Sequence, residues 1–343
     1  MNIKLILQTI RLSIGKLILD KKTPKKSTAL SPKKILFLRQ DGKIGDYIVS
    51  SFVFREIKKF NPEIKIGVVC TTKDSYLFKQ NPYIDQLYFV KKRSIFDYIK
   101  CGLSLAKERY DVVIDPTLSI KNRDLLLLRL INAKNYIGYK KSDYKIFTHS
   151  LESNQHFSKI YQKSLELAGI SNIETTYDIP YNADSAIEIQ QFLEKNNITN
   201  YITVNFFGAY RAKKVNNENI KRYLNYFTET RKNKQFVLLS YPEVTPILKE
   251  LSQEYKNIYV HDTTTIFHTI ELIRHSIQII STDTSTVHIA AGFNKPIIAI
   301  YKQDPIAFKH WNPNCKNDTH ILFYKENINE ISPDNINSEW IIN

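Results

Sequence analysis

Short apolar runs alternate with longer helical stretches along most of the chain, and this alternation constrains the fold more than any other feature. A first series predicts strands at 35–39, 65–70, 86–90, 111–116 and 136–139, with helices at 47–60, 96–108 and 123–131. After a less regular stretch, 140–184, a second series predicts strands at 201–206, 235–240, 257–261, 277–281 and 296–301, with helices at 216–230, 246–255, 266–275 and 284–293. Such alternation is typical of βα units around a parallel sheet. We therefore expect an α/β protein of two tandem domains, with ligands bound in a cleft between them.

The N-terminal segment, residues 1–32, differs in composition from these two domains. Seven aliphatic residues fall on one stripe of an expected helix: Ile3, Ile6, Leu7, Ile10, Ile14, Leu17 and Ile18. Nine basic residues, but only one acid, Asp20, fall within 1–34. A basic amphipathic helix can lie at the surface of an anionic membrane, and it can equally pack on the body of the protein. The sequence leaves both alternatives open.

Charge and cysteine usage narrow the classes of partner. The net charge of +15 favours anionic partners, but over half of it lies within 1–34, so the body is not basic enough to predict nucleic-acid binding. No run reaches the ~18 apolar residues of a membrane-spanning helix. The three scattered cysteines predict neither structural zinc nor a disulfide framework, and they fit a reducing compartment. We expect a cytoplasmic protein.

The segment "ISTDTSTVHIAAG" joins a predicted strand to a predicted helix. Asp283 is expected to cap this helix. Thr284, Ser285 and Thr286 would then present N–H and hydroxyl groups at a helix N-terminus, which is an anion site. His288 lies four residues after Thr284 and is expected on the same helix face. The alternative is a well-capped helix that carries an ordinary core histidine.

A second strand end, "VNFFGAYRAKKV", supplies cations. Gly208 permits a tight turn, after which Arg211, Lys213 and Lys214 converge and could compensate the charge of a diphosphate. Glu243 follows another predicted strand, where its carboxylate could accept hydrogen bonds from a ribose. The alternatives are a solvated basic loop and an exposed acid.

A third strand end, "RQDGKIGDYIV", places two carboxylates where a strand gives way to a helix. Asp46 is either the N-cap of the helix expected from Tyr47 or an exposed base held by a tight turn at Gly45. Asp41 could orient the loop or pair with Lys43. Composition alone leaves these roles unresolved.

Taken together, these segments resemble glycosyltransferase family 9, the ADP-heptose:lipopolysaccharide heptosyltransferases. "ILFLRQDGKIGDYIVSSFVFREIKKFNPEIKIGVV" followed by "NPYIDQLYFV" is similar to the start of the family, and "STDTSTVHIAAGFNKPIIAIY" to its C-terminal signature. "YDVVIDPT", "NYIGY", "GAYRAKK" and "DPIAFKHWNP" occur between and after them in the family's order. The resemblance covers residues 33 to about 313 and leaves out the N-terminal tail.

The resemblance implies a GT-B fold, in which two Rossmann-like domains enclose a cleft. It implies an acceptor-side domain at 33–180 and a nucleotide-sugar-binding domain at 181–343. The reaction would be an inverting, metal-independent transfer without a cofactor, from an ADP-sugar to a lipopolysaccharide or lipooligosaccharide core. Because that acceptor is lipid-linked, the N-terminal helix would hold the enzyme at the inner face of the cytoplasmic membrane.

The same resemblance implies roles for individual residues. Asp46 takes the position of the general base, in an acceptor-side loop with Asp41, Lys43 and Gly45. The implied donor-binding residues are Lys214, Arg211, Glu243, Asp283, Thr284, Ser285 and His288. The chain departs from the family's pattern at Ser285, where a glycine is usual, and at Tyr210, where a small hydroxyl residue is common.

Other functions compete with this interpretation. The same fold could transfer a different nucleotide-sugar in surface glycan synthesis, or bind nucleotide-sugars without catalysis. A dinucleotide-dependent oxidoreductase is disfavoured because the first predicted strand is followed by "RQDGKIGD" and not by GxGxxG.

Overall fold

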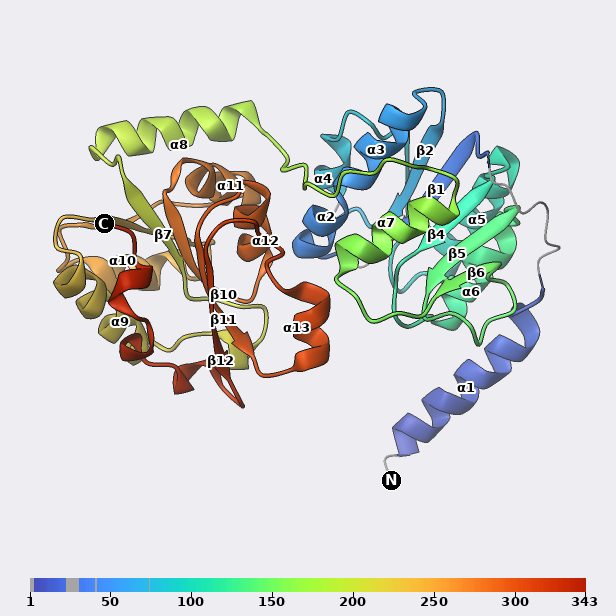
Figure 1. Cartoon of the computed structure of the whole chain (residues 1–343). Coiled ribbons are helices and arrows are strands. Elements are labelled where there is room, and N and C mark those ends of the chain that lie inside the picture. Colours follow the sequence, from blue (N-terminus) through green and yellow to red (C-terminus); the bar gives the residue numbers. More distant parts are fainter. Residues whose placement is uncertain (1–2, 23–30, 41, 74) are drawn as a thin grey trace. The chain divides into compact units, whose positions relative to one another are not determined.

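The computed structural model describes residues 3–22, 31–40, 42–73 and 75–343. The chain forms two compact units, Met1–Thr176 and Tyr177–Asn343 (Figure 1). The division falls within the segment 173–185, four residues before the boundary expected at 180. Asp41 and most of the linker expected after the N-terminal helix lie outside the described residues.

The first unit is built on a six-stranded sheet in which every ladder is parallel. Its strands are β1 (Lys34–Arg39), β2 (Lys65–Cys70), β3 (Gln86–Phe89), β4 (Val112–Asp115), β5 (Asn135–Tyr139) and β6 (His149–Leu151). They are arranged in the order β3-β2-β1-β4-β5-β6. This is the strand order of a Rossmann-like sheet.

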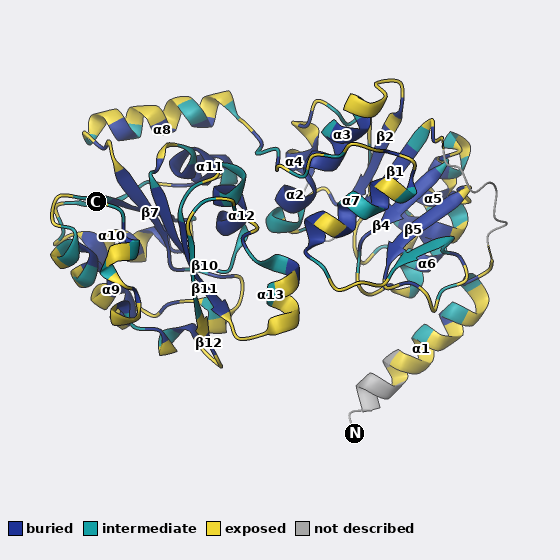
Figure 2. Ribbon diagram, viewed as in Figure 1, coloured by how far each residue is buried: buried dark blue, intermediate teal, exposed yellow. Residues whose placement is uncertain are grey.

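Helices cover both faces of this sheet, which explains why its central strands are continuous apolar runs (Figure 2). The helices after the N-terminal one are α2 (Ile44–Ser50), α3 (Phe52–Phe60), α4 (Ser75–Lys79), α5 (Ile95–Glu108), α6 (Asn122–Ile131) and α7 (Phe157–Leu167). The buried side chains of α5 and α6 form one core with Leu36 and Leu38 of β1. On the opposite face, the ring of Phe37 packs edge-on against that of Phe54 in α3.

Two expectations for this unit were wrong. The helix expected at 47–60 starts three residues earlier and is divided at Ser51 into α2 and α3. The stretch 140–184, expected to be irregular, contains β6 and α7.

The second unit repeats the architecture of the first. Its strands are β7 (Tyr201–Asn205), β8 (Gln235–Leu238), β9 (Ile258–Val260), β10 (Gln278–Thr282), β11 (Ile297–Lys302) and β12 (Thr319–Tyr324). Their order, β9-β8-β7-β10-β11-β12, is equivalent to that of the first sheet, and every ladder is again parallel. The sequence analysis missed the edge strand β12.

The helices of this unit also lie on both faces of its sheet (Figure 1). They are α8 (Ala183–Lys195), α9 (Asn217–Thr230), α10 (Thr245–Ser252), α11 (Ile266–His275), α12 (Ser285–Gly292) and α13 (Pro305–Trp311). A short 3-10 turn, η1 (Arg211–Lys213), follows β7, and three more such turns end the chain. The core on one face joins Ile202 and Val204 of β7 to Leu224 and Phe227 of α9.

The N-terminal helix α1 (Ile3–Leu19) packs against α6 of the first unit. Gly15 lies against Asn122 at the start of α6, and the Asn122 amide donates to the Arg11 carbonyl over 2.8 Å. The carboxylate of Asp20 accepts from the backbone N–H groups of Lys145 and Ile146.

The apolar stripe of α1 lies away from these contacts. Its described side chains are exposed, with Leu7 at 62%, Ile14 at 54% and Leu17 at 84%. Packing and an exposed apolar stripe therefore coexist in this helix. Within the described ranges, no helix combines the length and apolar character needed to cross a membrane.

Replacing Asp20 with Ala should loosen α1, because the N–H groups of Lys145 and Ile146 would lose their acceptor. An unsatisfied buried donor costs roughly 1–3 kcal/mol. Hydrogen–deuterium exchange should therefore accelerate across α1 and at these two amides. The exposed neighbour Asp143 provides the control, since Asp143→Ala should leave exchange in α1 unchanged. Equal protection in the Asp20 variant and the native chain would contradict the anchoring role.

Candidate functional site

Each sheet has one place where its strand order changes direction, between β1 and β4 in the first unit and between β7 and β10 in the second. The connections after these neighbouring strands leave on opposite sides and open a crevice at the carboxyl edge, where α/β proteins bind ligands. The segments singled out from the sequence follow β1, β7 and β10. The fold thus brings them to the edges where a ligand site is expected.

In the second unit, the loop after β7 meets the turn after β10. The Lys213 ammonium lies 2.5 Å from the Asp283 carboxylate, and both side chains are about one quarter exposed. Gly208 allows the loop to fold back on its own backbone, because a Cβ there would lie 2.7 Å from the Lys213 carbonyl oxygen. An ion pair therefore holds the basic loop at the end of β10.

This pairing changes two expectations. Asp283 does not cap the following helix, since the N-cap of α12 is Thr284 and Asp283 pairs with Lys213. The lysine that reaches the turn is Lys213, whereas Lys214 and Arg211 are exposed on the same loop. Glu243, also exposed, follows β8 and precedes α10 at the same edge of the sheet.

Hydroxyl groups at the end of β10 and the start of α12 cluster around Asn205 at the end of β7, and the sequence analysis did not identify this asparagine. The amide nitrogen of Asn205 lies 3.0 Å from the Thr284 hydroxyl and 3.2 Å from those of Ser281 and Thr286. The Thr284 and Thr286 hydroxyls are 2.7 Å apart. These contacts fix the start of α12, where the first N–H groups of a helix favour an anion. Ser285 is the first residue of that helix.

His288, on the second turn of α12, is a core residue. It is 4% exposed, and its ring lies 5.9 Å from that of Trp311. Burial lowers the pKa of this imidazole to about 4, because the charged form loses its hydration. In the described part of the chain, its Nδ1 has no hydrogen-bond partner. The ring is therefore neutral at pH 7, when it can act as a hydrogen-bond donor or acceptor but not as a cation.

In the first unit, Asp46 occupies the third position of α2. It is therefore not an N-cap, which is Lys43. The Asp46 side chain is 19% exposed, and its carboxylate lies 4.0 Å from the exposed Lys43 ammonium. Gly45 lies within the helix, and the left-handed turn falls instead at Gly42, with φ of 73°. Asp46 is thus held on a helical turn, with its carboxylate partly open to solvent.

Arg39 stabilises the first turn of α2 through hydrogen bonds, and the sequence analysis did not identify it. It is the last residue of β1, and its side chain is almost fully buried. Its guanidinium donates to the Ser50 hydroxyl, which in turn donates to the Asp46 carbonyl. The guanidinium also lies 5.6 Å from the ring of Tyr161 in α7. An arginine at the end of an apolar strand was the only sequence signal for this support.

A second polar group lies at the end of β4 in the same unit. The Asp115 carboxylate accepts from the backbone N–H and the hydroxyl of Thr117. The buried Lys141 ammonium donates to the carbonyls of Thr117 and Tyr139. Burial lowers the pKa of Lys141, and the nearby carboxylates of Asp115 and Glu152 oppose that shift.

The two edges therefore carry different chemistry. The second unit presents cations, hydroxyls and a helix N-terminus, which together suit a phosphorylated ligand. The first unit presents a carboxylate that can accept a proton. Across the described residues, no group of three or more His, Cys, Asp or Glu side chains could hold a metal ion.

Comparison with known proteins identifies relatives over most of the chain. The family model described as glycosyltransferase family 9 (heptosyltransferase) matches residues 99–340. Lipopolysaccharide heptosyltransferase 3 of Escherichia coli K12 is 25% identical over 292 residues, which are 79% of this chain and 83% of that protein.

Two solved structures share the fold at lower identity. A glycosyl transferase family 9 protein of Veillonella parvula superposes with a TM-score of 0.73 at 18% identity, covering 91% of this chain and 97% of that one. The E. coli ADP-heptose LPS heptosyltransferase II gives a TM-score of 0.66 at 16% identity, covering 90% and 97%. These likenesses place both units in the GT-B fold class.

The buried His288 should make the protein less stable in acid. Because its folded-state pKa of about 4 is below the ordinary value of 6.5, the unfolded chain binds more protons between these pH values. Stability from this residue is complete above pH 6.5 and is lost as the pH falls through 4, by an amount on the order of 3 kcal/mol. Urea unfolding should show that the free energy of unfolding of the native chain falls, relative to that of His288→Phe, as the pH drops below 6.5. Val287→Ala, at the adjacent buried position, is the control: it removes core packing but no titratable group, so its effect on stability should be the same at each pH. Parallel pH profiles for native chain and His288→Phe would contradict the prediction.

Proposed function

We propose that this chain, which belongs to glycosyltransferase family 9, transfers a sugar, with heptose the favoured candidate, from an ADP-sugar to a lipopolysaccharide or lipooligosaccharide core acceptor. The observation that carries the proposal is the division of chemistry between two sheets of equivalent strand order. A carboxylate follows the first strand of one, and cations follow the first strand of the other. The E. coli relatives are named as lipopolysaccharide heptosyltransferases, and one structure is titled for ADP-heptose.

In this proposal, Asp46 is the general base. Its carboxylate takes the proton from an acceptor hydroxyl as that oxygen attacks the anomeric carbon. The bond from this carbon to the diphosphate breaks on the opposite face, so the configuration inverts. The support from Arg39 and Ser50 fixes the helical turn that carries the base.

The second unit would stabilise the departing ADP. Negative charge accumulates on the diphosphate as the bond breaks, and Arg211, Lys214 and the N-terminus of α12 would offset it without a metal or cofactor. The Lys213–Asp283 pair would hold this loop in place, and Glu243 would accept from the ribose hydroxyls. His288 would contribute as a neutral hydrogen-bonding group and not as a cation. Closure of the protein around the bound donor would exclude water and so limit hydrolysis of the ADP-sugar.

Ser285 and Tyr210 bear on which sugar is transferred. Ser285 places a side chain at the first position of α12, where the family pattern has glycine, and Tyr210 is 67% exposed beside the basic loop. In this proposal, both side chains would change the shape of the space around the donor. A different nucleotide-sugar is therefore the competing donor, and nucleotide-sugar binding without transfer is the competing function. Mass spectrometry of the surface glycolipid from a strain lacking the gene would identify the missing sugar.

We also propose that α1 adsorbs to the inner face of the cytoplasmic membrane. Its exposed stripe, Leu7, Ile10, Ile14, Leu17 and Ile18, is bordered by exposed Arg11, Lys21 and Lys22. An apolar stripe flanked by cations fits the interface of an anionic bilayer. Peripheral binding of this kind would keep the enzyme near a lipid-linked acceptor.

Changing Asp46 to Asn should lower the transfer rate at least 100-fold, because a positioned general base contributes about 10²–10⁴. Affinity for ADP should stay within about twofold, since the proposed donor groups lie in the other unit. Turnover of an ADP-sugar with an acceptor extract and calorimetry with ADP would measure the two effects. Glu63→Gln, at an exposed acid in the same unit, is the matched control and should retain full activity. Near-native turnover by Asp46→Asn would remove this residue from the role of base.

Replacing Ile10, Ile14 and Leu17 together with Gln should weaken binding to vesicles that contain phosphatidylglycerol. Because all three side chains are at least half exposed, the substitutions should leave the folded state intact. Co-sedimentation with vesicles would measure the loss, and Ser13→Gln, at an exposed polar position of the same helix, is the control. Unchanged binding of the triple variant would exclude α1 as a membrane contact.

A further inference from the structure

A second apolar and basic surface lies on the first unit, at the turn between β3 and α5. We call it the α5 rim and define it as Lys91, Lys92, Arg93, Ile95, Phe96 and Leu103. No group in the proposed reaction belongs to it. Phe96 is 79% exposed, Leu103 53% and Ile95 42%. Phe96 and Leu103 are seven residues apart, or about two helical turns, so both project from the same face of α5.

The exposure of Phe96 is enforced by a well-capped helix start. Ser94 is the N-cap, and its hydroxyl accepts from the Asp97 N–H. The Asp97 carboxylate accepts from the Ser94 hydroxyl and from the Lys91 N–H. The Ser94 N–H donates to the Lys91 carbonyl and closes the turn. Because four contacts fix this turn, Phe96 cannot fold back onto the core without breaking them.

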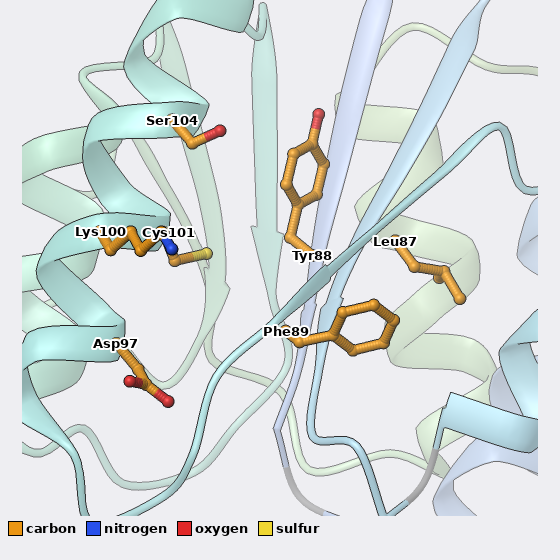
Figure 3. Close-up of a pocket in the computed structure, with 7 residues that line it drawn as sticks. All are labelled: Leu87, Tyr88, Phe89, Asp97, Lys100, Cys101 and Ser104. Atoms are coloured by element: carbon orange, nitrogen blue, oxygen red, sulfur yellow. The ribbon is translucent and has the colours of Figure 1, made fainter.

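A shallow hollow beside the rim extends the apolar surface. It has a volume of about 360 Å³ and lies between the edge strand β3 and α5. Figure 3 shows Asp97, Lys100, Cys101 and Ser104 of α5 lining it opposite β3. Phe89, the last residue of β3, is 44% exposed and also lines it.

The charge of the rim is strongly positive. Lys91, Lys92 and Arg93 are consecutive and all exposed, and Lys100 lies one helical turn beyond Phe96. Asp97 is the acid among them, and its oxygens are engaged in capping the helix. Protein–protein interfaces are depleted in lysine, so a lysine-rich rim around an exposed Phe fits a protein partner poorly.

We propose that the α5 rim is a second membrane-contact surface, which binds the interface of a bilayer that contains anionic phospholipids. Phe96, Ile95 and Leu103 enter the boundary between headgroups and acyl chains. The three consecutive cations lie at the level of the lipid phosphates, with their aliphatic stems along the apolar surface.

The position of the rim gives this contact a consequence for the first unit. The turn follows β3, so it lies at the carboxyl edge of the sheet, as does the first turn of α2, which follows β1 and carries Asp46. β1 is two strands away in the sheet, which is roughly 10 Å. Binding through the rim therefore brings the edge that carries Asp46 close to the lipid surface. The contact itself is independent of the sugar transferred, because vesicle binding is measured without turnover.

The test isolates the rim from α1. In the Ile10→Gln, Ile14→Gln, Leu17→Gln background, the protein should retain measurable binding to vesicles of phosphatidylethanolamine and phosphatidylglycerol. Phe96→Asp should then weaken that binding roughly tenfold, as expected when an apolar side chain no longer leaves water. Replacing Lys91, Lys92 and Arg93 with Gln should weaken it at low salt and flatten its salt dependence. Ile187→Asp, at a 58% exposed position on α8, is the matched control.

A second measurement tests insertion directly. A tryptophan placed by Phe96→Trp should be quenched by brominated acyl chains in these vesicles, whereas Ile187→Trp should not. Two results would overturn the proposal: Phe96→Asp binding vesicles as well as the triple-Gln background does, or a Phe96→Trp signal that the brominated lipid leaves unchanged. Sedimentation velocity tests the alternative that a second copy of the chain occupies the α5 rim. If Phe96→Asp converted a dimer to a monomer, the rim would be a protein interface and the proposal would be wrong.

Discussion

Every strand in both sheets is parallel to its neighbours, and the rest of the structure follows from that constraint. Parallel strands need helices to connect them, and these helices cover both faces of the sheet. The strands therefore become continuous apolar runs, and polar chemistry is left to the edges. Because all carboxyl ends emerge at one edge, residues far apart in the chain gather there. For this reason the amide nitrogen of Asn205 lies 3.2 Å from the hydroxyl of Thr286, although the two residues are 81 positions apart in the sequence.

The two units share a strand order but not the chemistry at their edges. The first strand of one ends at buried Arg39 and is followed by the turn that carries Asp46. The first strand of the other is followed by a basic loop held to Asp283. Some reactions need both a proton acceptor and groups that offset the charge of a leaving diphosphate, and two separate sheet edges can supply them. A carboxylate beside the phosphate-binding cations would form ion pairs with them and would not be free to accept a proton.

Much of the fold could be predicted from the sequence, because buried parallel strands leave a strong signal. The strand expected at 65–70 matches β2 at both ends. β6 was missed because it is a three-residue edge strand that is only partly buried, without a continuous apolar run. The edge strand β12 is also half exposed, and it follows a segment rich in Asn and Lys.

The candidate site was less accessible to sequence reasoning. Spacing placed Asp283 before a helix but could not show that a loop 70 residues earlier would reach it. Nor could it decide which of two adjacent lysines turns toward that carboxylate. Asn205 carried no local signal, since its partners are hydroxyls on another strand and helix. Each of these features depends on contacts between distant segments.

In the proposed membrane contact, the packing at Gly15 would set the orientation of the first unit relative to the lipid surface. A Cβ there would meet the Asn122 side chain at about 2.2 Å, so α1 sits tightly against α6 along this side. Successive residues of a helix are separated by about 100° of rotation. Moving the glycine one position along the chain would therefore rotate the apolar stripe by about 100° around the helix axis, relative to α6. The absence of a side chain at Gly15 thus fixes the direction of the apolar stripe relative to α6, and in the proposed contact it would also set the tilt of the first unit on the bilayer.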